Sequence, residues 1–398
     1  MICVAEGKTG IRAPQSGKSE AQEKSSQREG DRKSMNRPGM HMISPARAKV
    51  RGGVFGPILE GVREKMLPYQ WQVLNDEIPD IEKSHCVENF RIAAGTSKGD
   101  FYGFVFQDSD LGKWLEAAAW SLMAHPDPDL ERKADEAVEL MAAAQRPDGY
   151  LDTYFSCTGL EKRWTNLRDC HELYCAGHLL EGAVTYYEAT GKSRALEIMR
   201  KYADYIDSVF GPEEGKCHGY PGHPEIELAL CRLYDATGEE RYLRLAAYFI
   251  NERGKTPNYF VEEQKKLDKP FFPLNTSFGL KYFQSHLPVR AQKTMEGHAV
   301  RALYLASGMA DVALRTGDDG LFEACETLFD NVASRRMYVT GGVGSTYIGE
   351  AFTFDYDLPP DRAYTETCAS VALVFGPHLS SRGVLYLSRT TRDRTPAC

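Results

Sequence analysis

The chain has 398 residues, with 42% hydrophobic and 26% charged side chains, which is the balance of a folded globular protein. Its formal net charge of −8 disfavours nucleic acid as a partner, because nucleic-acid-binding proteins normally carry a basic surface. No apolar run approaches the ~20 residues of a bilayer-spanning helix, and the first 50 residues lack the apolar core of a secretory signal. We therefore expect a cytoplasmic protein with no membrane partner, acting on a polar small molecule.

Both ends of the chain differ from its middle. Residues 1–50 are rich in Ser, Gly, Lys, Arg, Gln and Pro and nearly lack aromatic and branched apolar side chains. Such a segment buries too little apolar surface to offset the entropy lost on ordering, so it is predicted to be disordered. Residues 51–375 are predicted to form the folded domain. In residues 376–398 arginines, serines, threonines and two prolines interrupt a helical pattern, which predicts an irregular tail.

From about Val54 the apolar residues follow a helical period. Segments 114–122 and 134–144 place apolar side chains at i, i+3, i+4 and i+7, which predicts two amphipathic helices. Asp129, which precedes the second segment, is predicted to cap the N-terminus of that helix.

A helical unit recurs further along the chain. Tyr187-Glu-Ala-Thr-Gly191, Tyr234-Asp-Ala-Thr-Gly238 and the looser Leu314-Arg-Thr-Gly317 each end an amphipathic stretch at a glycine suited to a left-handed helix end. A new helix is expected within a few residues of each glycine. Repeated helical hairpins with few strand signals predict an all-α fold, and polar and aromatic residues in the connecting loops favour closure into an (α/α)6-type barrel. A sugar site is expected at the mouth that these loops line.

Three histidines stand at expected starts of apolar helical runs: His171, His223 and His298. An imidazole can donate to or accept from a sugar hydroxyl, so these positions in a repeated array are candidate sugar contacts. A lone histidine at a helix start is more often a structural partner, and this interpretation stays open. The stretch His171–His178 is not the HExxH zinc motif, because its second histidine follows after seven residues rather than four.

Carboxylate and aromatic residues gather at two expected turns. One group contains Asp108-Ser-Asp110 with Lys113 and Trp114, and the other spans residues 146–155. These residue types suit sugar binding, but Pro147-Asp148-Gly149 is also a strong turn signal in its own right. Both interpretations stay open.

The stretch from Gly341 to Cys368 has the most distinctive pattern. Its glycines permit a tight loop that could bring Glu350 into a cavity. It is not a phosphate-binding loop, since the Lys-Ser/Thr pair is missing. Glu366 and Cys368, two residues apart, are both acceptable zinc ligands, but two ligands do not complete a site.

Taken together, these blocks resemble glycoside hydrolase family 127, the β-L-arabinofuranosidases, over about residues 66–375. The blocks that carry the resemblance, in chain order, are Leu-Pro-Tyr-Gln70, Asp-Ser-Asp110 with Lys113-Trp114, Ala-Gln145, Asp-Gly-Tyr-Leu151, His-Glu-Leu-Tyr-Cys-Ala-Gly-His178, Gly-His-Pro-Glu-Ile-Glu227, Gly-His298, Gly-Ser345, Gly-Glu350 and Glu-Thr-Cys-Ala-Ser370. The resemblance implies an (α/α)6 barrel followed by β-sandwich domains, and a retaining enzyme that releases terminal L-arabinofuranose.

The resemblance also implies roles for single residues. In that family a zinc-bound cysteine thiolate is the nucleophile and a glutamate is the acid/base, in place of the usual two carboxylates. By motif, Glu350 corresponds to the acid/base, and Glu366 and Cys368 correspond to two of the zinc ligands. The implied sugar contacts are Gln70, His171, His223 and His298.

One departure from the family pattern affects the expected activity. The family's paired cysteines, a nucleophile and a further zinc ligand, lie well beyond the Glu-Thr-Cys368 motif. This chain has only Cys398 after that motif, in a segment that matches nothing in the family. We therefore expect a barrel that is incomplete at its C-terminal end and that hydrolyses an aryl β-L-arabinofuranoside negligibly.

Two other functions stay open on the sequence. A non-catalytic carbohydrate-binding helical barrel would use the three histidines and need no metal. A sugar epimerase built on an (α/α) barrel would use paired histidines as acid and base, although it leaves the block from Gly341 to Cys368 without a role.

Overall fold

The computed structural model describes residues 50, 52–267 and 279–379. The segment predicted to be disordered lies almost wholly outside these residues, as does most of the predicted tail. The last described helix, α15 (Thr367–Leu379), runs past the predicted end of the domain at Phe375. Among the described residues, no helix combines the length and the apolar content that crossing a bilayer requires.

Helices make up nearly all of the regular structure in the described residues. The longer ones, in chain order, are α2 (Phe55–Gly61), α3 (Leu67–Leu74), α4 (Cys86–Ala93), α5 (Asp108–Ala124), α6 (Pro128–Ala144), α7 (Thr153–Thr158), α8 (Glu172–Thr190), α9 (Arg194–Val209), α10 (Ile226–Thr237), α11 (Glu240–Glu252), α12 (Tyr259–Gln264), α13 (Ala299–Thr316), α14 (Asp319–Asn331) and α15. Short 3₁₀ and π segments are η1 (Val62–Met66), η2 (Leu160–Lys162), η4 (Gly279–Phe283), η5 (Val289–Ala291), η6 (Val332–Arg336) and η7 (Ile348–Glu350). Within the described ranges, one small antiparallel sheet pairs β1 (Gly297–His298) with β2 (Ala351–Phe352).

The three predicted helical hairpins are confirmed as α8–α9, α10–α11 and α13–α14. Helices α8, α10 and α13 end at Gly191, Gly238 and Gly317, whose φ angles of 73°, 71° and 70° are left-handed. Glycine closes a helix in this conformation at the lowest cost, because it has no Cβ to clash with the backbone. The chain therefore turns back directly after each inner helix.

The predicted cap of α6 was wrong. Asp127, not Asp129, accepts from the backbone N–H groups at the start of the helix. Proline suits the first helical position, since its missing N–H would have no partner there, so the helix begins at Pro128 and the preceding residue becomes the cap. The carboxylate of Asp129 instead pairs with Arg132 and Lys133 on the exposed surface of the helix.

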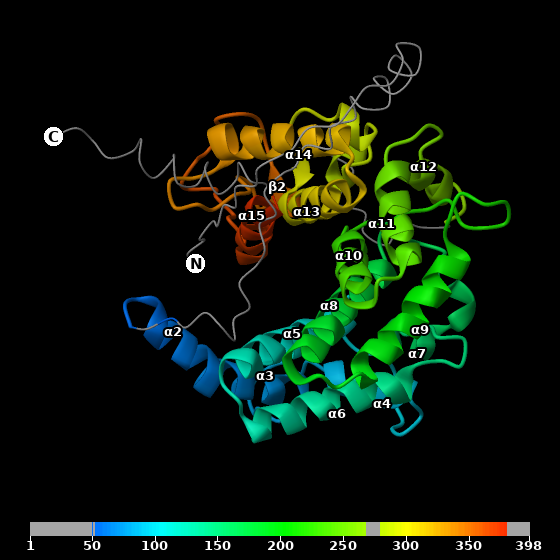
Figure 1. Cartoon of the computed structure of the whole chain (residues 1–398), viewed down its shortest axis with the longest axis vertical. Helices are drawn as coiled ribbons and strands as arrows, with labels where there is room; N and C mark the ends of the chain where they lie inside the picture. The colour runs from blue at the N-terminus through cyan, green and yellow to red at the C-terminus, as the bar shows by residue number, and fades with distance from the viewer. Residues whose placement is uncertain (1–49, 51, 268–278, 380–398) are drawn as a thin grey trace, which may run out of the picture.

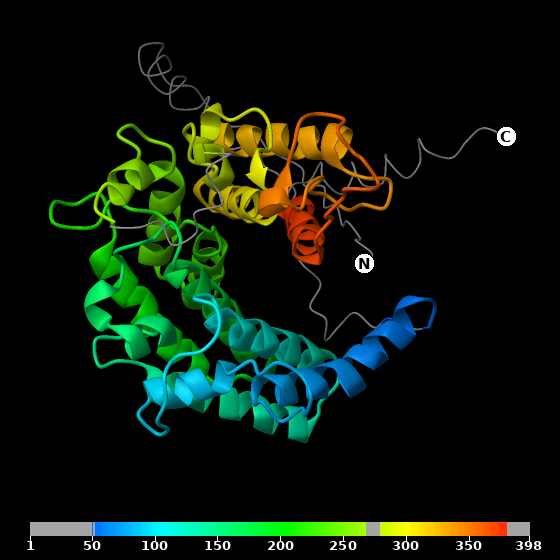
Figure 2. The same cartoon turned by 180° about the vertical axis from the view of Figure 1, so that it is seen from behind.

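The hairpins form a curved double layer of helices (Figures 1 and 2). Helices α5, α8, α10, α13 and α15 pack in succession on the inner side, and α6, α9, α11 and α14 lie behind them. The inner helices α8 and α13 are buried on nearly every face, whereas the outer helices α9 and α11 have one buried and one exposed face. This arrangement confirms the predicted all-α, (α/α)6-type fold. Both views show the described ring open between α15 and α2.

Two glycines let α5 and α8 pack backbone to backbone. A Cβ atom at Gly112 would lie 2.6 Å from the backbone of His178, and one at Gly182 would lie 2.6 Å from the carbonyl oxygen of Gly112. Only glycine permits this approach, so the two positions set the depth of α8 in the barrel. They thereby also set the position of the residue that precedes α8, His171.

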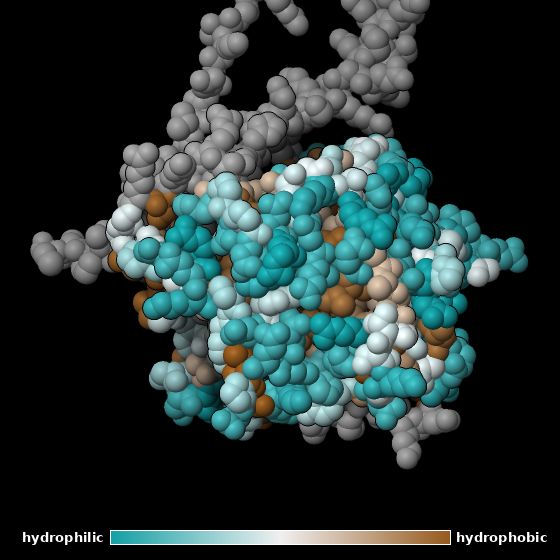
Figure 3. Space-filling view, turned by 90° about the horizontal axis from the view of Figure 1, so that it is seen from below, coloured by the Kyte–Doolittle hydropathy of each residue, from teal (hydrophilic) through white to brown (hydrophobic). Residues whose placement is uncertain are grey.

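Apolar side chains fill the space between the helix layers rather than the surface. Trp71 and Trp114 lie with their ring centroids 4.4 Å apart where α3 meets α5, and Phe249 and Leu303 are fully buried further along the chain. The face seen in Figure 3 is mostly hydrophilic, with small separate hydrophobic patches. The inner ends of the helices, where polar side chains are buried, are therefore the unusual part of the molecule.

Candidate active site

The three predicted histidines lie together at one end of the inner helices. His171 and His298 directly precede α8 and α13, and His223 lies three residues before α10. Their rings form a row, with centroids 5.8 Å apart from His171 to His223 and 5.6 Å apart from His223 to His298. All three side chains are buried. The residues before the N-termini meet because every hairpin returns the chain to the same end of the barrel.

Backbone carbonyl groups fix the tautomers of two of the rings. Nδ1 of His171 lies 2.6 Å from the carbonyl oxygen of Asp169, and Nδ1 of His223 lies 2.8 Å from that of Pro224. A carbonyl oxygen only accepts, so Nδ1 carries the hydrogen in both rings. Nε2 of His171 and Nε2 of His223 are consequently hydrogen-bond acceptors.

The third ring, that of His298, has the opposite tautomer. Its Nδ1 accepts from the backbone N–H groups of Val300 and Arg301, as a capping side chain does. Nε2 must then carry the hydrogen, and it lies 3.0 Å from Oε2 of Glu350, to which it donates. The row of histidines therefore offers a ligand two acceptor atoms, Nε2 of His171 and Nε2 of His223. The donor, Nε2 of His298, is already hydrogen-bonded to Glu350.

All three rings are held neutral. Burial lowers the pKa of His171 to about 3 and that of His298 to about 4, and it lowers the pKa of His223 well below its usual value. The guanidinium of Arg301 is the second cause of the low pKa of His171 and of His223, because it repels a second positive charge. Neutral imidazoles suit an uncharged ligand that carries hydroxyl groups.

Glu350 lies directly before β2, and the pairing of β2 with β1 brings it beside His298. Its Oε2 accepts from His298 at 3.0 Å, and its Oε1 accepts from the hydroxyl of Tyr364 at 2.9 Å. The hydrogen bond from His298 lowers the pKa of Glu350, against the opposite effect of partial burial. The backbone of Glu350 is left-handed, with a φ of 52°, a strained conformation for this residue. Glu350 is thus an ionised carboxylate with both oxygens engaged.

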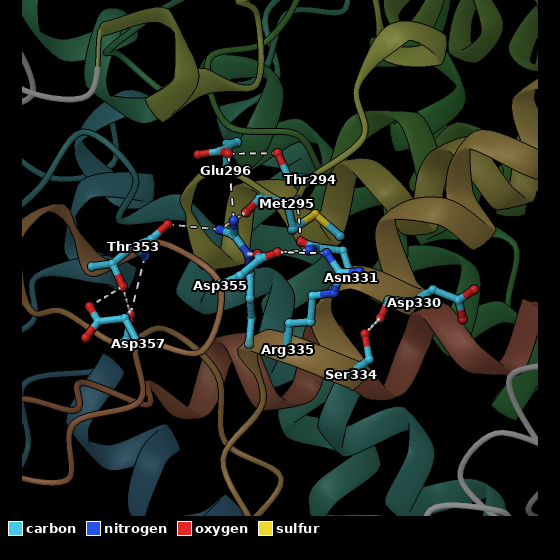
Figure 4. A network of polar contacts seen from close by, with 12 residues as sticks. Thr294, Met295, Glu296, Asp330, Asn331, Ser334, Arg335, Thr353, Asp355 and Asp357 are labelled. Atoms are coloured by element: carbon cyan, nitrogen blue, oxygen red, sulfur yellow. Dashed lines mark hydrogen bonds and ion pairs between the residues drawn. The ribbon is translucent and has the colours of Figure 1, made fainter.

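A polar network behind this pair holds the two strands together (Figure 4). Nη1 of the buried Arg336 donates to the carbonyl oxygen of Met295 at 2.7 Å and to that of Thr353 at 3.0 Å. Nε of Arg336 donates to Asp355 at 2.8 Å. Met295 precedes β1 and Thr353 follows β2, so Arg336 ties together the segments that carry His298 and Glu350.

Glu366 and Cys368 lie at the start of α15. Oε2 of Glu366 is buried and has no hydrogen-bond partner in the described part of the chain. Burial raises the pKa of Glu366, and burial together with the neighbouring Glu366 raises the pKa of the Cys368 thiol to about 11. Without a cation beside it, Cys368 is therefore a protonated thiol at neutral pH.

In the described ranges, one group of three side chains places its possible metal-binding atoms close enough together to hold a metal ion. His298, Glu350 and Glu366 each place one ligand atom within 4.8 Å of the others. The unpartnered oxygen of Glu366 fits a cation, and a thiol such as that of Cys368 loses its proton when it binds zinc. His298 fits less well, because its Nε2 carries a hydrogen and a ligating nitrogen needs a free lone pair. A cation at this place would therefore be held mainly by the carboxylates of Glu366 and Glu350.

The predicted sugar contact Gln70 is not brought to the histidines by any contact in the described residues. It lies on α3 with an exposed side chain and no hydrogen bond to another described residue. Its neighbour Trp71 packs against Trp114 and thereby anchors α3 on α5. The structure thus joins six of the seven predicted site residues in one region and leaves Gln70 on a neighbouring helix.

Several side chains that were not predicted as site residues contact the histidine row. The ring of Tyr174 lies 4.4 Å from that of His223, and its hydroxyl accepts from Lys113 at 2.9 Å. Arg301 places Nη2 3.4 Å from Nε2 of His171. Tyr174 and Arg301 each follow a predicted histidine by three residues, a spacing that puts two side chains on the same face of a helix. This spacing was the available signal for both.

In the first of the two predicted turn groups of carboxylate and aromatic residues, Asp108 binds another loop. The carboxylate of Asp108 is buried at the start of α5 and accepts from both the backbone N–H, at 2.7 Å, and the hydroxyl, at 2.5 Å, of Thr153. In the second cluster Asp148 accepts from the backbone N–H of Tyr150 within a tight turn. Both carboxylates therefore shape loops, as the turn interpretation expects.

A barrel of paired helices thus gathers neutral histidines and an oriented carboxylate at its loop end, an arrangement that suits a ligand rich in hydroxyl groups. The sequence model of the β-L-arabinofuranosidase GH127 catalytic domain matches residues 48–379. The chain therefore belongs to glycoside hydrolase family 127.

Known relatives agree with this assignment. The chain is 48% identical over 328 residues to the non-reducing end β-L-arabinofuranosidase of Bifidobacterium longum subsp. longum, an alignment that covers 78% of this chain and 50% of that protein. A solved GH127 β-L-arabinofuranosidase from Geobacillus stearothermophilus T6 superposes with a TM-score of 0.81 at 55% identity, over 85% of this chain and 53% of that chain. A second GH127 β-arabinofuranosidase superposes with a TM-score of 0.75 at 35% identity, over 88% and 53% of the two chains. The chain thus spans about half the length of the relatives that it matches.

Proposed function

We propose that this chain provides the sugar-binding pocket and the acid/base residue for the release of terminal L-arabinofuranose from β-L-arabinofuranosides. The observation that carries the proposal is the carboxylate of Glu350, held at 3.0 Å by His298 and at 2.9 Å by Tyr364 at the end of the histidine row. The matched relatives with β-L-arabinofuranosidase activity support the choice of sugar.

In this proposal the histidines form hydrogen bonds with the hydroxyl groups of the sugar. Nε2 of His171 and Nε2 of His223 accept hydrogen bonds from sugar hydroxyls, because their Nδ1 atoms already donate to backbone carbonyls. Both rings are neutral, so binding an uncharged sugar removes no charge from water. Gln70 stays a proposed sugar contact on the strength of the family resemblance alone.

Glu350 would act first as the acid and then as the base. Its ionised state in the free protein suits the second step, in which a carboxylate takes a proton from water. The first step needs a proton on the same carboxyl group. A sugar that covers Glu350 would exclude water and raise its pKa, which favours uptake of that proton.

The proposed cofactor is zinc, with Glu366 and Cys368 among its ligands. Structural and catalytic zinc sites take three or four protein ligands, and carboxylate oxygen and thiolate sulfur are both suitable. The buried, unpartnered oxygen of Glu366 and the protonated thiol of Cys368 are groups whose state zinc would change. Bound zinc would keep the sulfur atom of Cys368 deprotonated at neutral pH.

A second candidate function is a carbohydrate-binding barrel without catalysis. The raised pKa of the Cys368 thiol favours it, since a thiol must lose its proton to bind zinc. The histidine row would serve both functions equally. Metal dependence therefore separates them.

Two measurements test the proposed function. Calorimetry with methyl β-L-arabinofuranoside, with the pyranoside as control and with and without a zinc chelator, is expected to show binding of the furanoside. Hydrolysis of 4-nitrophenyl β-L-arabinofuranoside is expected to be negligible for this chain alone and to appear when the chain is joined to the C-terminal half of a relative. In the joined chain, Glu350→Gln is expected to lower hydrolysis at least ~100-fold. A chain that binds no furanoside would overturn the sugar assignment, and turnover that survives Glu350→Gln would overturn the acid/base role. Binding without turnover in either form, unaffected by chelator, would favour the binding barrel.

The cytoplasm is the proposed location. Eight cysteines lie in the described residues and all are free thiols, as expected of a protein from a reducing compartment. Fractionation of cells that produce the protein would test this proposal.

A further inference from the structure

A group of aromatic side chains lies on the loop that connects α4 to α5. Phe104 and Tyr102 are 63% and 45% exposed, and Phe106 is partly buried. Large apolar side chains that gather on a surface mark binding sites, whereas single ones carry no such meaning. The loop precedes an inner helix, as the segments with the three histidines do, so it lies at the same end of the barrel. Figure 2 shows it, in cyan, on the face of the ring that also carries β1 and β2. The exposed rings are therefore at the mouth of the proposed sugar pocket.

Two of these rings connect the histidine row to the surface. The ring centroid of Phe106 lies 5.3 Å from that of His171. Phe104 stacks on Phe106, with centroids 5.1 Å apart and an angle of 4° between the ring planes. Because Phe106 covers one face of Phe104, the exposed surface of Phe104 belongs mainly to the other face. A line of ring contacts thus leads from the pocket to an exposed aromatic face.

Two buried amide side chains hold the backbone of this loop in place. The side chain of Asn89, on α4, donates to the carbonyl oxygen of Tyr102 at 2.8 Å and accepts from the backbone N–H of Tyr102 at 3.1 Å. The side chain of Gln107 accepts from the backbone N–H of Phe104 at 3.4 Å. The backbone N–H of Gln107 donates to the carbonyl oxygen of Phe104 at 2.9 Å. The exposure of Phe104 is therefore fixed by hydrogen bonds on both sides of Gly103.

We infer that Phe104, supported by Phe106, forms a second sugar subsite, which binds the sugar ring that is linked to the terminal arabinofuranose. A glycoside consists of a terminal sugar and the group bonded to it, and the histidine row with Glu350 accounts for the first part only. The C–H groups on the face of a sugar are apolar, so the sugar and the aromatic face both leave water when they stack. A ring that is already held in place loses little entropy on binding. The inference rests on the proposed function, because it needs an arabinofuranose in the histidine pocket.

Disaccharides provide the test. Calorimetry on the full chain compares methyl β-L-arabinofuranoside with the methyl glycosides of 2-, 3- and 5-linked β-L-arabinofuranobiose. Wild type is expected to bind at least one disaccharide about 3- to 10-fold more tightly than the single sugar, the range for one aromatic contact. Phe104→Ala is expected to lose this gain and to bind the single sugar as wild type does. Phe104→Trp is expected to keep the gain, and its added fluorescence should change with that disaccharide but not with the single sugar.

The chain offers a matched control for the loss of an exposed ring. Phe55 is 69% exposed on α2, a helix that has no buried residue, so Phe55→Ala is expected to change no affinity. Three results would overturn the inference while binding of the single sugar upholds the proposed function: equal wild-type affinity for all four sugars, a gain that survives Phe104→Ala, or an equal loss for single sugar and disaccharide in that variant. A wild-type chain that binds none of the sugars would overturn both.

Discussion

The two halves of the site are held in different ways. In the histidine half each ring is buried and is oriented by backbone groups within three residues of it; its members are His171, His223 and His298. The carboxylate half is partly exposed and depends on segments far apart in the chain; its members are Glu350, Tyr364, Glu366 and Cys368. Glu350 and His298, which join the halves, are 52 residues apart.

This difference shows which part of the fold holds each half of the site in place. The histidine half forms together with the inner helices, because each ring is attached to the start of one of them. The position of Glu350 in the carboxylate half depends in addition on the pairing of β1 with β2 and on Arg336, which binds to the segments on both sides. The histidine row is therefore as stable as the barrel, whereas the position of Glu350 has a separate support.

The largest effect is expected when this support is removed. Arg336→Met would leave the carboxylate of Asp355 and two buried carbonyl groups without their donor. Removing one partner of a buried ion pair typically costs about 3–5 kcal/mol, and a loss of this size in the free energy of unfolding is expected in urea titrations.

The neighbouring arginine provides the matched control. Arg335 also binds Asp355, at 3.0 Å, but its side chain is 50% exposed. Arg335→Met is therefore expected to cost less than about 1 kcal/mol. If both variants lost the same free energy of unfolding, the burial of Arg336 would not matter. Arg336 would then not be the residue that holds the segments around β1 and β2 together.

A smaller loss of stability is expected when a substitution forces apart the inner helices that position the histidines. In Gly112→Ala the new Cβ atom would lie 2.6 Å from the backbone of His178, so α5 and α8 must move apart. Overpacking of this kind costs about 1–3 kcal/mol, and both thermal stability and affinity for the arabinofuranoside should fall. Gly320→Ala is the control, since a Cβ atom there meets nothing closer than 3.6 Å and alanine favours a helix. Unchanged sugar affinity in Gly112→Ala would show that the depth of α8 does not set the histidine row.

Two acids next to the site, Asp355 and Glu172, are expected to respond to pH in opposite directions. Hydrogen bonds from Asn331, Arg335 and Arg336 overcome partial burial and lower the pKa of Asp355 to about 2. Its contribution to stability is therefore present above its usual value of 3.8 and is lost as the pH falls toward 2. Asp355→Asn should flatten the acid limb of a plot of unfolding free energy against pH.

For Glu172 the sign is reversed. Burial raises the pKa of Glu172, the first residue of α8, to about 8 from its usual value of 4.5. The folded state then binds more protons than the unfolded state between these values, so stability falls as the pH rises from about 4.5 to 8. Glu172→Gln should reduce this slope, because the amide is neutral throughout, and the slope that remains is expected from other buried acids such as Glu181 and Glu263. An unchanged slope in Glu172→Gln would assign the whole effect to the other buried acids.

The fold could be predicted from the sequence because its signals are local. Gly191, Gly238 and Gly317 marked the helix ends correctly, since a left-handed helix end depends only on the residue that occupies it. The error at Asp129 has the same origin: both Asp127 and Asp129 are good caps, and the intervening Pro128 decides between them. Helical period and end signals therefore sufficed for the hairpins and the ring.

The site could be predicted only in part, for a physical reason. The histidines stand at helix starts, which the sequence marks, so their convergence followed from the repeated array. Strands β1 and β2 have two residues each, too few for any period, and nothing local shows that they pair. The link between Arg336 and both strands is likewise a long-range contact. The tautomers of the rings depend on single backbone groups, and only coordinates reveal them.

The smallest effect is expected at the exposed edge of the carboxylate half. Tyr364→Phe removes the donor to Oε1 of Glu350, but Glu350 is 41% exposed and water can replace the hydroxyl, while His298 still orients Oε2. Stability should change by less than about 1 kcal/mol. Hydrolysis of the aryl β-L-arabinofuranoside by the chain joined to the C-terminal half of a relative should change by less than about tenfold. Tyr347→Phe, at a tyrosine that is 66% exposed, should change neither. If Tyr364→Phe instead reduced turnover as much as Glu350→Gln, the exposed loop, and not the buried histidine, would orient the carboxylate. The two halves of the site would then be independent of each other.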